Sequence, residues 1–315
     1  MIERLEILNY RGVSRGALYG LGSLTVLVGP NNSGKSTVLE ALLLAGARGD
    51  GYALSFVGTR RGWTGLGTLQ AWIRGGESRI SSGDSVNMTR LLLRLSAPDT
   101  VTATLDSTIA GNATFREDGR GGFSTGNLIP AFIEPQSIGL DPALLDRAVS
   151  QADLAGERRQ LIDLLKPLLP GLRDLRILQA GSRYALHVED DSAQPWPAAV
   201  AGDGLKKLLV LASSLAADQS GLVLVEEPET YLHVGAYSKV AQLFWQAANA
   251  AKPKQIVATT HSLEFVDALF GFAGVDPSKA TLFRLSLAKG ELKSVRVPGD
   301  KVRELRAEIG EDLRR

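Results

Sequence analysis

The chain has 315 residues, of which 44% are hydrophobic and 22% are charged, as in folded globular proteins and unlike disordered ones. It carries 35 Lys and Arg residues against 34 Asp and Glu residues, so the net charge neither favours nor excludes nucleic-acid binding. The absence of cysteine excludes disulfides, thiolate zinc sites and cysteine nucleophiles. Because the N-terminus has no apolar signal-peptide core and no apolar run could span a bilayer, we expect a cytoplasmic protein without membrane segments.

The first elements in chain order are predicted to be a strand, a second strand and a helix. Alternating apolar residues over 2–7 predict an opening strand that breaks at Gly12. Residues 24–28 (LTVLV) are apolar and β-branched, as in a strand buried on both faces. Gly29 ends this run, and apolar positions within 38–43 then share one face of a helix.

The middle of the chain predicts a β lobe followed by a helical arm. Residues 47–83 are rich in Gly, Arg and Ser and predict only a short helix over 69–73. Alternating runs over 88–115 predict an antiparallel sheet. Two helices are then expected, one that begins at Asp141-Pro142 and one over about 154–166. A hairpin over 175–188 follows.

The last third alternates helices with strands. A helix is expected from Gly204 to about residue 217, an apolar strand over 222–225, and a helix over 236–251. Residues 256–259 are expected to form the last core strand. Apolar spacing over 302–313 predicts a final amphipathic helix.

Residues 29–36 (GPNNSGKS) fit the phosphate-loop pattern G-x-x-x-x-G-K-[ST] without a mismatch. Its glycines let backbone N–H groups converge on phosphate oxygens, and the following helix N-terminus adds positive potential. Lys35 is expected to reach the outer phosphates of ATP, and the Ser36 hydroxyl to coordinate Mg²⁺. The predicted nucleotide-binding residues here are Asn31, Asn32, Ser33, Gly34, Lys35, Ser36 and Thr37.

The apolar run 222–225 delivers two adjacent carboxylates, Glu226 and Glu227. Phosphoryl transfer needs one acid in the Mg²⁺ shell and one group that orients the attacking water. We assign Glu226 to the metal and Glu227 to the water. An acidic turn after a core strand is common, so this motif is specific only in combination with the phosphate loop.

The EEPE sequence at 226–229, the following YLH and the TTHS sequence at 259–262 resemble the stand-alone AAA/ABC-like ATPases related to the overcoming-lysogenisation-defect (OLD) proteins. They resemble more distantly the SMC and double-strand-break repair ATPases. The resemblance covers nearly the whole chain, including NYRG at 9–12 and GDGLKK at 202–207. Four central motifs stand in the family's order.

The resemblance implies an α/β fold, namely an ABC-type P-loop ATPase head with a mixed central sheet, an antiparallel β lobe and a short helical arm. It implies one head over residues 1–315. The P-loop and β lobe would occupy about 1–135, the helical arm and hairpin about 136–195, and the signature, acidic strand and switch histidine about 196–315.

The resemblance also implies roles for single residues. His261 would be the switch histidine that contacts the γ-phosphate and the attacking water. Leu232 and His233 occupy the place of the loop that couples the two active sites of a dimer. Arg11 would lie near the nucleotide, at the edge of the first sheet. Glu226 stands where the wider class has Asp, as is usual for this branch.

Residues 202–204 take the place of the family's signature segment, whose backbone N–H groups and helix N-terminus close on the γ-phosphate of the other subunit. Ala201 or Gly202 stands where the wider class has Ser, so the side chain that assists in trans stays open. The glutamine-loop residue also stays open, between Gln70 and Gln136. The predicted signature residues are Gly202, Asp203 and Gly204.

These features predict a Mg²⁺-dependent ATP hydrolase that forms an ATP-dependent homodimer and controls a partner protein or a DNA complex, in DNA repair or anti-phage defence. The alternatives are a nucleotide-sensing scaffold with little turnover and a transporter ATPase, against which the missing LSGGQ-type signature weighs. The chain leaves no room for long coiled-coil arms or a Toprim nuclease domain, so a separately encoded nuclease or Toprim partner is expected.

Basic residues are expected to make a minor contribution to DNA binding. Arg90 and Arg94 of the β lobe are expected to support weak, non-specific binding. The adjacent basic pairs at 60–61, 158–159 and 206–207 are expected to be solvated faces, because the surrounding charge is balanced.

Overall fold

The computed structural model describes residues 1–60, 72–97, 100–106, 108–114, 128–134, 143–180, 183–192, 194–230, 232–308 and 310–314. Its helices are α1 (Lys35–Gly46), α2 (Gly51–Arg60), α4 (Ala143–Leu154), α5 (Arg158–Leu165), α6 (Asp203–Ala217), α7 (Tyr237–Ala248), α8 (Leu263–Phe270) and α9 (Gly299–Glu308). Its strands are β1 (Arg4–Tyr10), β2 (Val13–Tyr19), β3 (Leu24–Val28), β4 (Glu77–Gly83), β5 (Met88–Ala97), β6 (Thr100–Leu105), β7 (Thr108–Thr114), β8 (Ala131–Ile133), β9 (Asp174–Ala180), β10 (Arg183–Glu189), β11 (Trp196–Pro197), β12 (Leu222–Glu226), β13 (Gln255–Thr259), β14 (Ala280–Ala288) and β15 (Glu291–Pro298).

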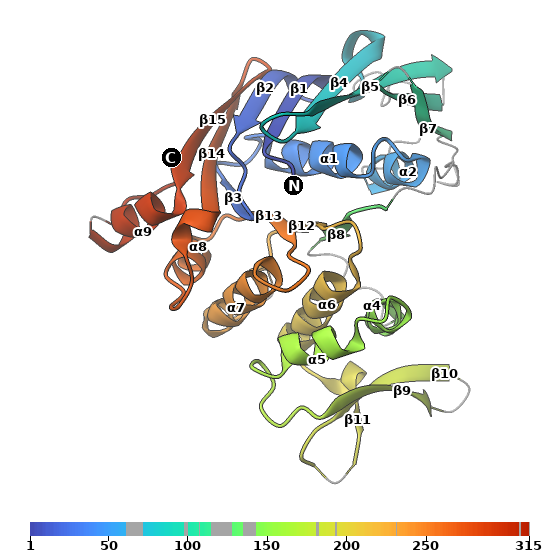
Figure 1. Ribbon diagram of the computed structural model, residues 1–315, viewed down its shortest axis with the longest axis vertical. Coiled ribbons are helices and arrows are strands. Elements are labelled where there is room, and N and C mark those ends of the chain that lie inside the picture. Colours follow the sequence, from blue (N-terminus) through green and yellow to red (C-terminus); the bar gives the residue numbers. More distant parts are fainter. Residues whose placement is uncertain are drawn as a thin grey trace.

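A mixed sheet of 12 described strands organises the molecule, in the order β7-β6-β5-β4-β1-β2-β15-β14-β3-β13-β12-β8. Strands β14, β3, β13, β12 and β8 run parallel, whereas β1 and β4 to β7 form the antiparallel lobe. Strands β11, β10 and β9 form a small separate sheet beneath the helices (Figure 1). This arrangement confirms the predicted α/β head with a mixed sheet and an antiparallel lobe.

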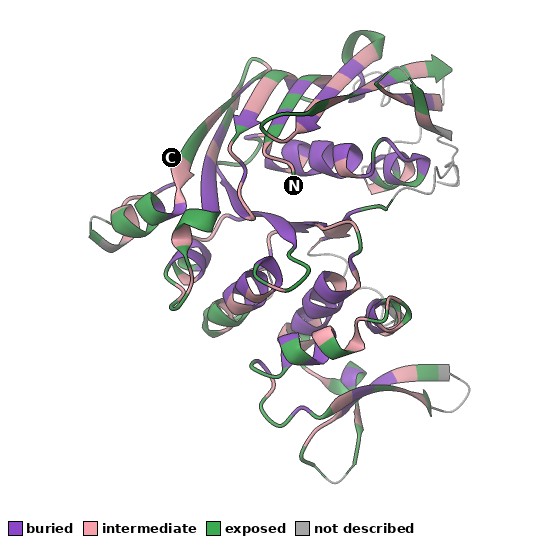
Figure 2. Cartoon of the chain, viewed as in Figure 1, coloured by how far each residue is buried: buried purple, intermediate pink, exposed green. Residues whose placement is uncertain are grey.

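Helix α1 occupies the space that the curved sheet encloses (Figure 1). It contacts β1 and β4 on one side and β12 and β13 on the other. Its sequence is apolar nearly all round, as expected for a fully buried helix, and Figure 2 shows it buried along its length. The loop that opens this helix is therefore fixed between two halves of the sheet.

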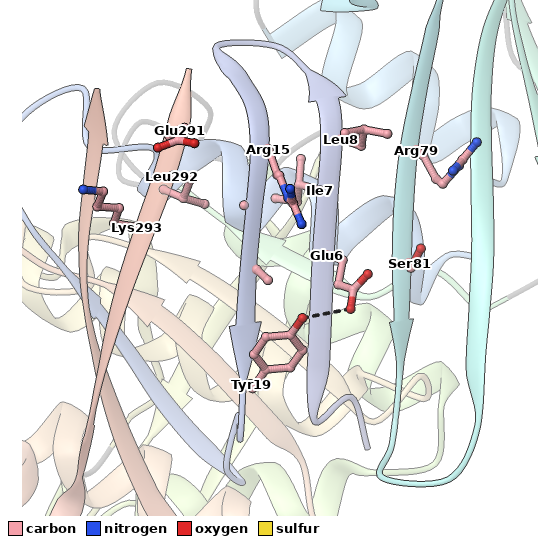
Figure 3. A pocket seen from close by; sticks show the side chains of 12 residues that line it. Glu6, Ile7, Leu8, Arg15, Tyr19, Arg79, Ser81, Glu291, Leu292 and Lys293 are labelled. Atoms are coloured by element: carbon pink, nitrogen blue, oxygen red, sulfur yellow. Dashed lines mark hydrogen bonds between the residues drawn. The ribbon is translucent and has the colours of Figure 1, made fainter. Parts of the chain in front are cut away.

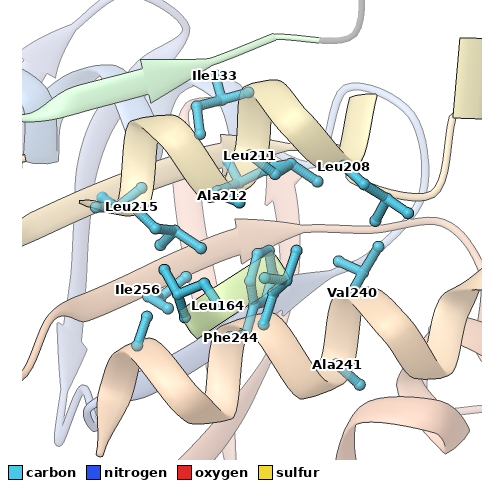
Figure 4. Packing of buried hydrophobic residues seen from close by; sticks show 14 of the residues in the cluster. Ile133, Leu164, Leu208, Leu211, Ala212, Leu215, Val240, Ala241, Phe244 and Ile256 are labelled. Carbon is cyan, nitrogen blue, oxygen red and sulfur yellow. The ribbon is translucent and has the colours of Figure 1, made fainter. Parts of the chain in front are cut away.

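The parallel strands are covered on both faces, so their side chains alternate between two apolar clusters. In β3, Leu24, Val26 and Val28 face the cluster that helices α4 to α8 build, whereas Leu27 faces the cluster around α1. Figure 4 shows part of the first cluster, in which Leu208 and Leu211 of α6 pack toward Val240 and Phe244 of α7. Burial on both faces explains why the sequences of these strands are continuous apolar runs.

Several predicted boundaries are wrong. Residues 47–83 contain α2 and β4, which the Gly-rich composition concealed, and the short helix expected over 69–73 lies mostly outside the described residues. The predicted helix over 154–166 begins only at Arg158, because Gly156 adopts a positive φ of 74° and interrupts it. Strand β13 is not the last core strand, because β14 follows α8 and pairs in parallel with β3.

Candidate nucleotide site

The loop between β3 and α1 has the backbone of a phosphate cradle. Gly29, Asn32 and Gly34 all have positive φ, at 145°, 62° and 94°. A Cβ at Gly29 would lie 2.4 Å from the carbonyl oxygen of Leu285, so this position admits only glycine. The first turn of α1 contains no acidic residue, and its N-cap residue, Gly34, has no side chain that could cap the helix. The N–H groups of this first turn therefore face the loop, where a bound anion can accept hydrogen bonds from them.

The Lys35 ammonium lies inside this loop. Its Nζ donates to the carbonyl oxygens of Gly29, at 2.8 Å, and Pro30, at 3.0 Å. Burial lowers the pKa of Lys35, while Glu227 and Glu226 act in the opposite direction. The loop thus carries a single, partly desolvated cation at the place where phosphates would enter.

The end of β12 brings the two predicted acids to the loop. Ser36 Oγ donates to Glu226 Oε1 at 2.5 Å, so the two candidate metal ligands are in direct contact. A hydroxyl and a carboxylate are oxygen ligands of the kind that Mg²⁺ prefers. Glu227 follows with a left-handed φ of 44°, and its N–H donates to the Thr259 carbonyl at 3.1 Å. The neighbouring strand β13 therefore holds the turn that presents Glu227.

Glu227 faces the predicted switch histidine. His261 Nε2 lies 3.5 Å from Glu227 Oε1, and Thr230 Oγ1 donates to Glu227 Oε2 at 3.2 Å. Burial and, secondly, the Lys35 charge lower the pKa of His261, against the opposing effect of Glu227. The imidazole is therefore neutral near pH 7 and able both to accept and to donate a hydrogen bond.

The third acid of the EEPE sequence, Glu229, was given no role in the sequence-based prediction. It is 9% exposed, and its Oε1 accepts hydrogen bonds from Thr260 Oγ1, at 2.7 Å, and from the His261 N–H, at 3.1 Å. Burial raises the pKa of Glu229. The sequence could have pointed to Glu229, because it is a third acid two positions after the assigned pair, Glu226 and Glu227. Glu229 fixes the backbone of the turn that carries His261.

Replacing Glu229 tests this positioning. We expect Glu229→Ala to lower turnover and melting temperature together, because loss of a hydrogen-bonded buried carboxylate costs about 1.5–3 kcal/mol. Glu229→Gln keeps a carbonyl oxygen for the Thr260 and His261 donors, so it should restore most of both quantities. Phosphate release and thermal unfolding measure the two effects. Equal turnover in the Ala and Gln variants would show that Glu229 does not position the histidine.

The predicted site residues outside the signature segment line one open pocket of about 470 Å³. The glutamine candidates Gln70 and Gln136 lie outside the described residues, as does Tyr231. The signature segment, Gly202 to Gly204, is not part of this lining and opens α6 elsewhere. The lining residues are Arg11, Gly12, Asn31, Asn32, Ser33, Gly34, Lys35, Ser36, Thr37, Glu226, Glu227, Thr259 and His261.

Lys207, expected on a solvated face, is buried and connects α6 to the acidic turn. Its side chain is 2% exposed, and its Nζ donates to the carbonyl oxygens of Thr230 and, at 3.3 Å, Glu227. Burial lowers the pKa of Lys207 to about 8. The helix that begins with the signature segment is therefore joined to the turn that carries Glu227.

A second hollow, of about 480 Å³, lies on the outer face of β1, β2, β4 and β15 (Figure 3). Side chains of both signs line it, including Glu6, Arg15 and Arg79, and Tyr19 donates to Glu6 at 2.9 Å. It contains neither the loop nor the acid–histidine pair, so we place the candidate site at the first pocket.

Two family models match the chain. One, described as "AAA ATPase domain", matches residues 1–48, which contain β3 and the phosphate loop. The other, described as "AAA domain, putative AbiEii toxin, Type IV TA system", matches residues 112–267, which contain α6, the acidic strand and His261. The two matches thus cover both halves of the pocket.

Two curated relatives are uncharacterised proteins of Methanocaldococcus jannaschii. MJECL10 is 39% identical over 70 residues, which are 21% of this chain and 32% of MJECL10. MJECL11 is 27% identical over 113 residues, which are 36% of this chain and 98% of MJECL11. The chain therefore spans about a third of the length of MJECL10.

Solved SMC heads share the fold. The SMC head bound to the C-winged helix domain of ScpA aligns with a TM-score of 0.62 at 16% identity, over 94% of this chain and 97% of that one. The Thermotoga maritima SMC head aligns with a TM-score of 0.55 at 15% identity, over 94% of this chain and 98% of that one. The Pyrococcus furiosus SMC head bound to the C-terminal domain of ScpA aligns with a TM-score of 0.61 at 13% identity, over 98% of this chain and 99% of that one. Two segments of the chain thus match AAA-type ATPase-domain models, and the chain has the fold of an SMC head.

Proposed function

We propose that the protein is a Mg²⁺-dependent ATPase that works as a head-to-tail homodimer. The observation that carries this proposal is the meeting of three features at one pocket, namely the Lys35 ammonium, the Ser36–Glu226 contact and the Glu227–His261 pair. Phosphoryl transfer needs a cation for the phosphates, oxygen ligands for a hard metal ion and groups that position a water. The pocket offers all three.

Each group has a part in the proposed reaction. The loop N–H groups and Lys35 bind the outer phosphates. Ser36 and Glu226 would hold a Mg²⁺ ion, which would neutralise part of the phosphate charge. Glu227 orients the attacking water and accepts its proton, and neutral His261 hydrogen-bonds the water and the γ-phosphate. Arg11, Asn31 and Asn32 line the pocket where the nucleotide would continue outward.

The dimer is proposed because the signature segment lies outside the pocket of its own chain. A second copy that turned its α6 N-terminus toward this pocket would add backbone N–H groups at the γ-phosphate. Lys207 would then connect the helix that contacts the partner's nucleotide with the turn that carries the chain's own Glu227. ATP binding would close the dimer, and hydrolysis would open it.

Enlarging Gly204 tests this arrangement. A Cβ there would make only an ordinary 3.5 Å contact with Leu232, so Gly204→Leu should fold and bind ATP as the parent does. We expect it to abolish the ATP-dependent dimer, because the bulky side chain keeps the backbone from the partner's γ-phosphate. Light scattering with and without ATP measures the mass. An intact ATP-dependent dimer in Gly204→Leu would contradict a signature role for this segment.

The cycle would control a partner protein or a DNA complex, in DNA repair or anti-phage defence. Two of the structurally similar SMC heads are described as bound to domains of ScpA, and one family model is described as "AAA domain, putative AbiEii toxin, Type IV TA system". A separately encoded nuclease or Toprim protein is the proposed partner. In the described part of the chain, no helix has the length and apolarity that crossing a membrane requires.

A further inference from the structure

Arg60 is buried against three carboxylates. It is the last residue of α2, and its side chain is 7% exposed. Its Nη1 donates to Glu40 Oε1 at 2.6 Å, its Nε to Glu134 Oε1, and its Nη2 to Glu226 Oε2. The expectation that this arginine lies on a solvated face is therefore wrong. Three acids from distant parts of the sequence share one guanidinium.

The surroundings keep this guanidinium charged and fixed. Its carbon lies 4.8 Å from the centre of the Phe132 ring. Burial works against the charge, but the three carboxylates outweigh burial and raise the pKa of Arg60. Glu40 is fully buried on α1, and its other oxygen accepts from Arg11, which lines the nucleotide pocket. The contacts thus run from Arg11 through Glu40 and Arg60 to Glu226.

The consequence falls on Glu226, whose two oxygens are held by different partners. Ser36 Oγ contacts Oε1, and Arg60 Nη2 contacts Oε2. These contacts fix the rotation of the carboxylate with one oxygen toward the phosphate loop. Carboxylates that bind metal ions are commonly hydrogen-bonded by such outer partners, which orient them. A planar guanidinium carries five donors on three nitrogens in a fixed fork, so it reaches separated carboxylates in set directions, whereas the three donors of an ammonium all leave one nitrogen and rotate freely.

We infer that Arg60 is a positioning residue for the proposed metal site, which orients Glu226 toward Ser36 and couples that orientation to Arg11 through Glu40. This inference rests on the proposed Mg²⁺-dependent function. It assigns a role within the site to a residue that does not line the pocket. No local sequence pattern marks Arg60, because its three partners lie 20, 74 and 166 positions away.

The test separates metal binding from nucleotide binding. Mn²⁺ affinity is measured by electron paramagnetic resonance with a slowly hydrolysed ATP analogue, and affinity for the metal-free analogue is measured by titration in EDTA. In Arg60→Met we expect Mn²⁺ affinity to fall about 10–100-fold, as for other outer partners of metal ligands. Affinity for the metal-free analogue should stay at the parent value, because Arg60 does not line the nucleotide pocket. Arg74→Met, the same change at an exposed arginine, should alter neither.

Arg60→Lys is the second variant, in case Arg60→Met does not fold. It keeps a positive charge among the buried carboxylates. We expect it to fold and still to weaken Mn²⁺ binding, since an ammonium lacks the fork of donors. Folded variants that bind Mn²⁺ as tightly as the parent would overturn the inference. An equal loss of metal-free affinity would overturn it too. If the parent itself shows no metal-dependent binding of the analogue, the proposed function fails instead.

Discussion

Lys35→Ala is expected to weaken ATP binding by about 100-fold or more. Its ammonium is the cation inside the phosphate loop, where it donates to the carbonyl oxygens of Gly29 and Pro30. A hydrogen bond between charged groups contributes up to about 3 kcal/mol, which is more than a hundredfold in affinity. The change should not unfold the protein, because it removes a buried charge from a loop between two rigid elements. Isothermal titration with ATP measures the affinity.

Lys252→Ala is the matched control for Lys35→Ala. Lys252 is exposed and pairs with Glu157 at 2.7 Å, so its loss should leave both ATP affinity and folding unchanged. Thermal unfolding of both variants would show that each is folded. Unchanged ATP affinity in folded Lys35→Ala would contradict the assignment of the phosphate loop.

Glu227→Gln is expected to keep ATP bound and to lose at least about 100-fold in turnover, as when a positioned general base is removed. The amide can occupy the place of the carboxylate beside His261 and Thr230, but it cannot accept the proton of the water. Because ATP stays intact, this variant should also accumulate the closed dimer. Phosphate release measures the first effect, and light scattering in ATP measures the second.

The control for this variant is Glu291→Gln, at an exposed position at the start of β15, which should hydrolyse ATP at the parent rate. Glu226→Gln should differ from Glu227→Gln by weakening the dependence on Mg²⁺, since Glu226 contacts Ser36. Parent-like turnover in Glu227→Gln would move the role of base to another group, and His261 would be the next candidate.

The sequence predicted the parts of the site that depend on local patterns. The phosphate loop follows from glycine spacing between a buried strand and a helix, and Glu226 and Glu227 follow from an apolar strand that ends in acids. Parallel strands present such ends at one edge of the sheet, which is why loop, acids and histidine meet. The doubly covered strands β3, β12 and β13 were recognisable from their continuous apolar runs.

The remaining features depend on contacts between distant segments. Lys207 was expected on a solvated face because the surrounding charge is balanced, but its ammonium donates to carbonyl oxygens of the acidic turn. Strand β14 was missed because its place beside β3 becomes evident only once the chain crosses over after α8. Charged residues are seldom fully buried unless they are paired, so partners must be known before burial can be predicted.

The most direct test of the central claim is phosphate release by the parent protein as its concentration is varied at saturating ATP. The proposed dimer requires Mg²⁺-dependent release whose rate per chain rises with protein concentration and then levels off as dimers form. Gly204→Leu should stay at the low rate throughout, because it binds ATP without closing. A rate per chain that is constant over the whole range would contradict the shared site. Absence of Mg²⁺-dependent release, with ATP still bound, would instead identify a nucleotide-sensing scaffold.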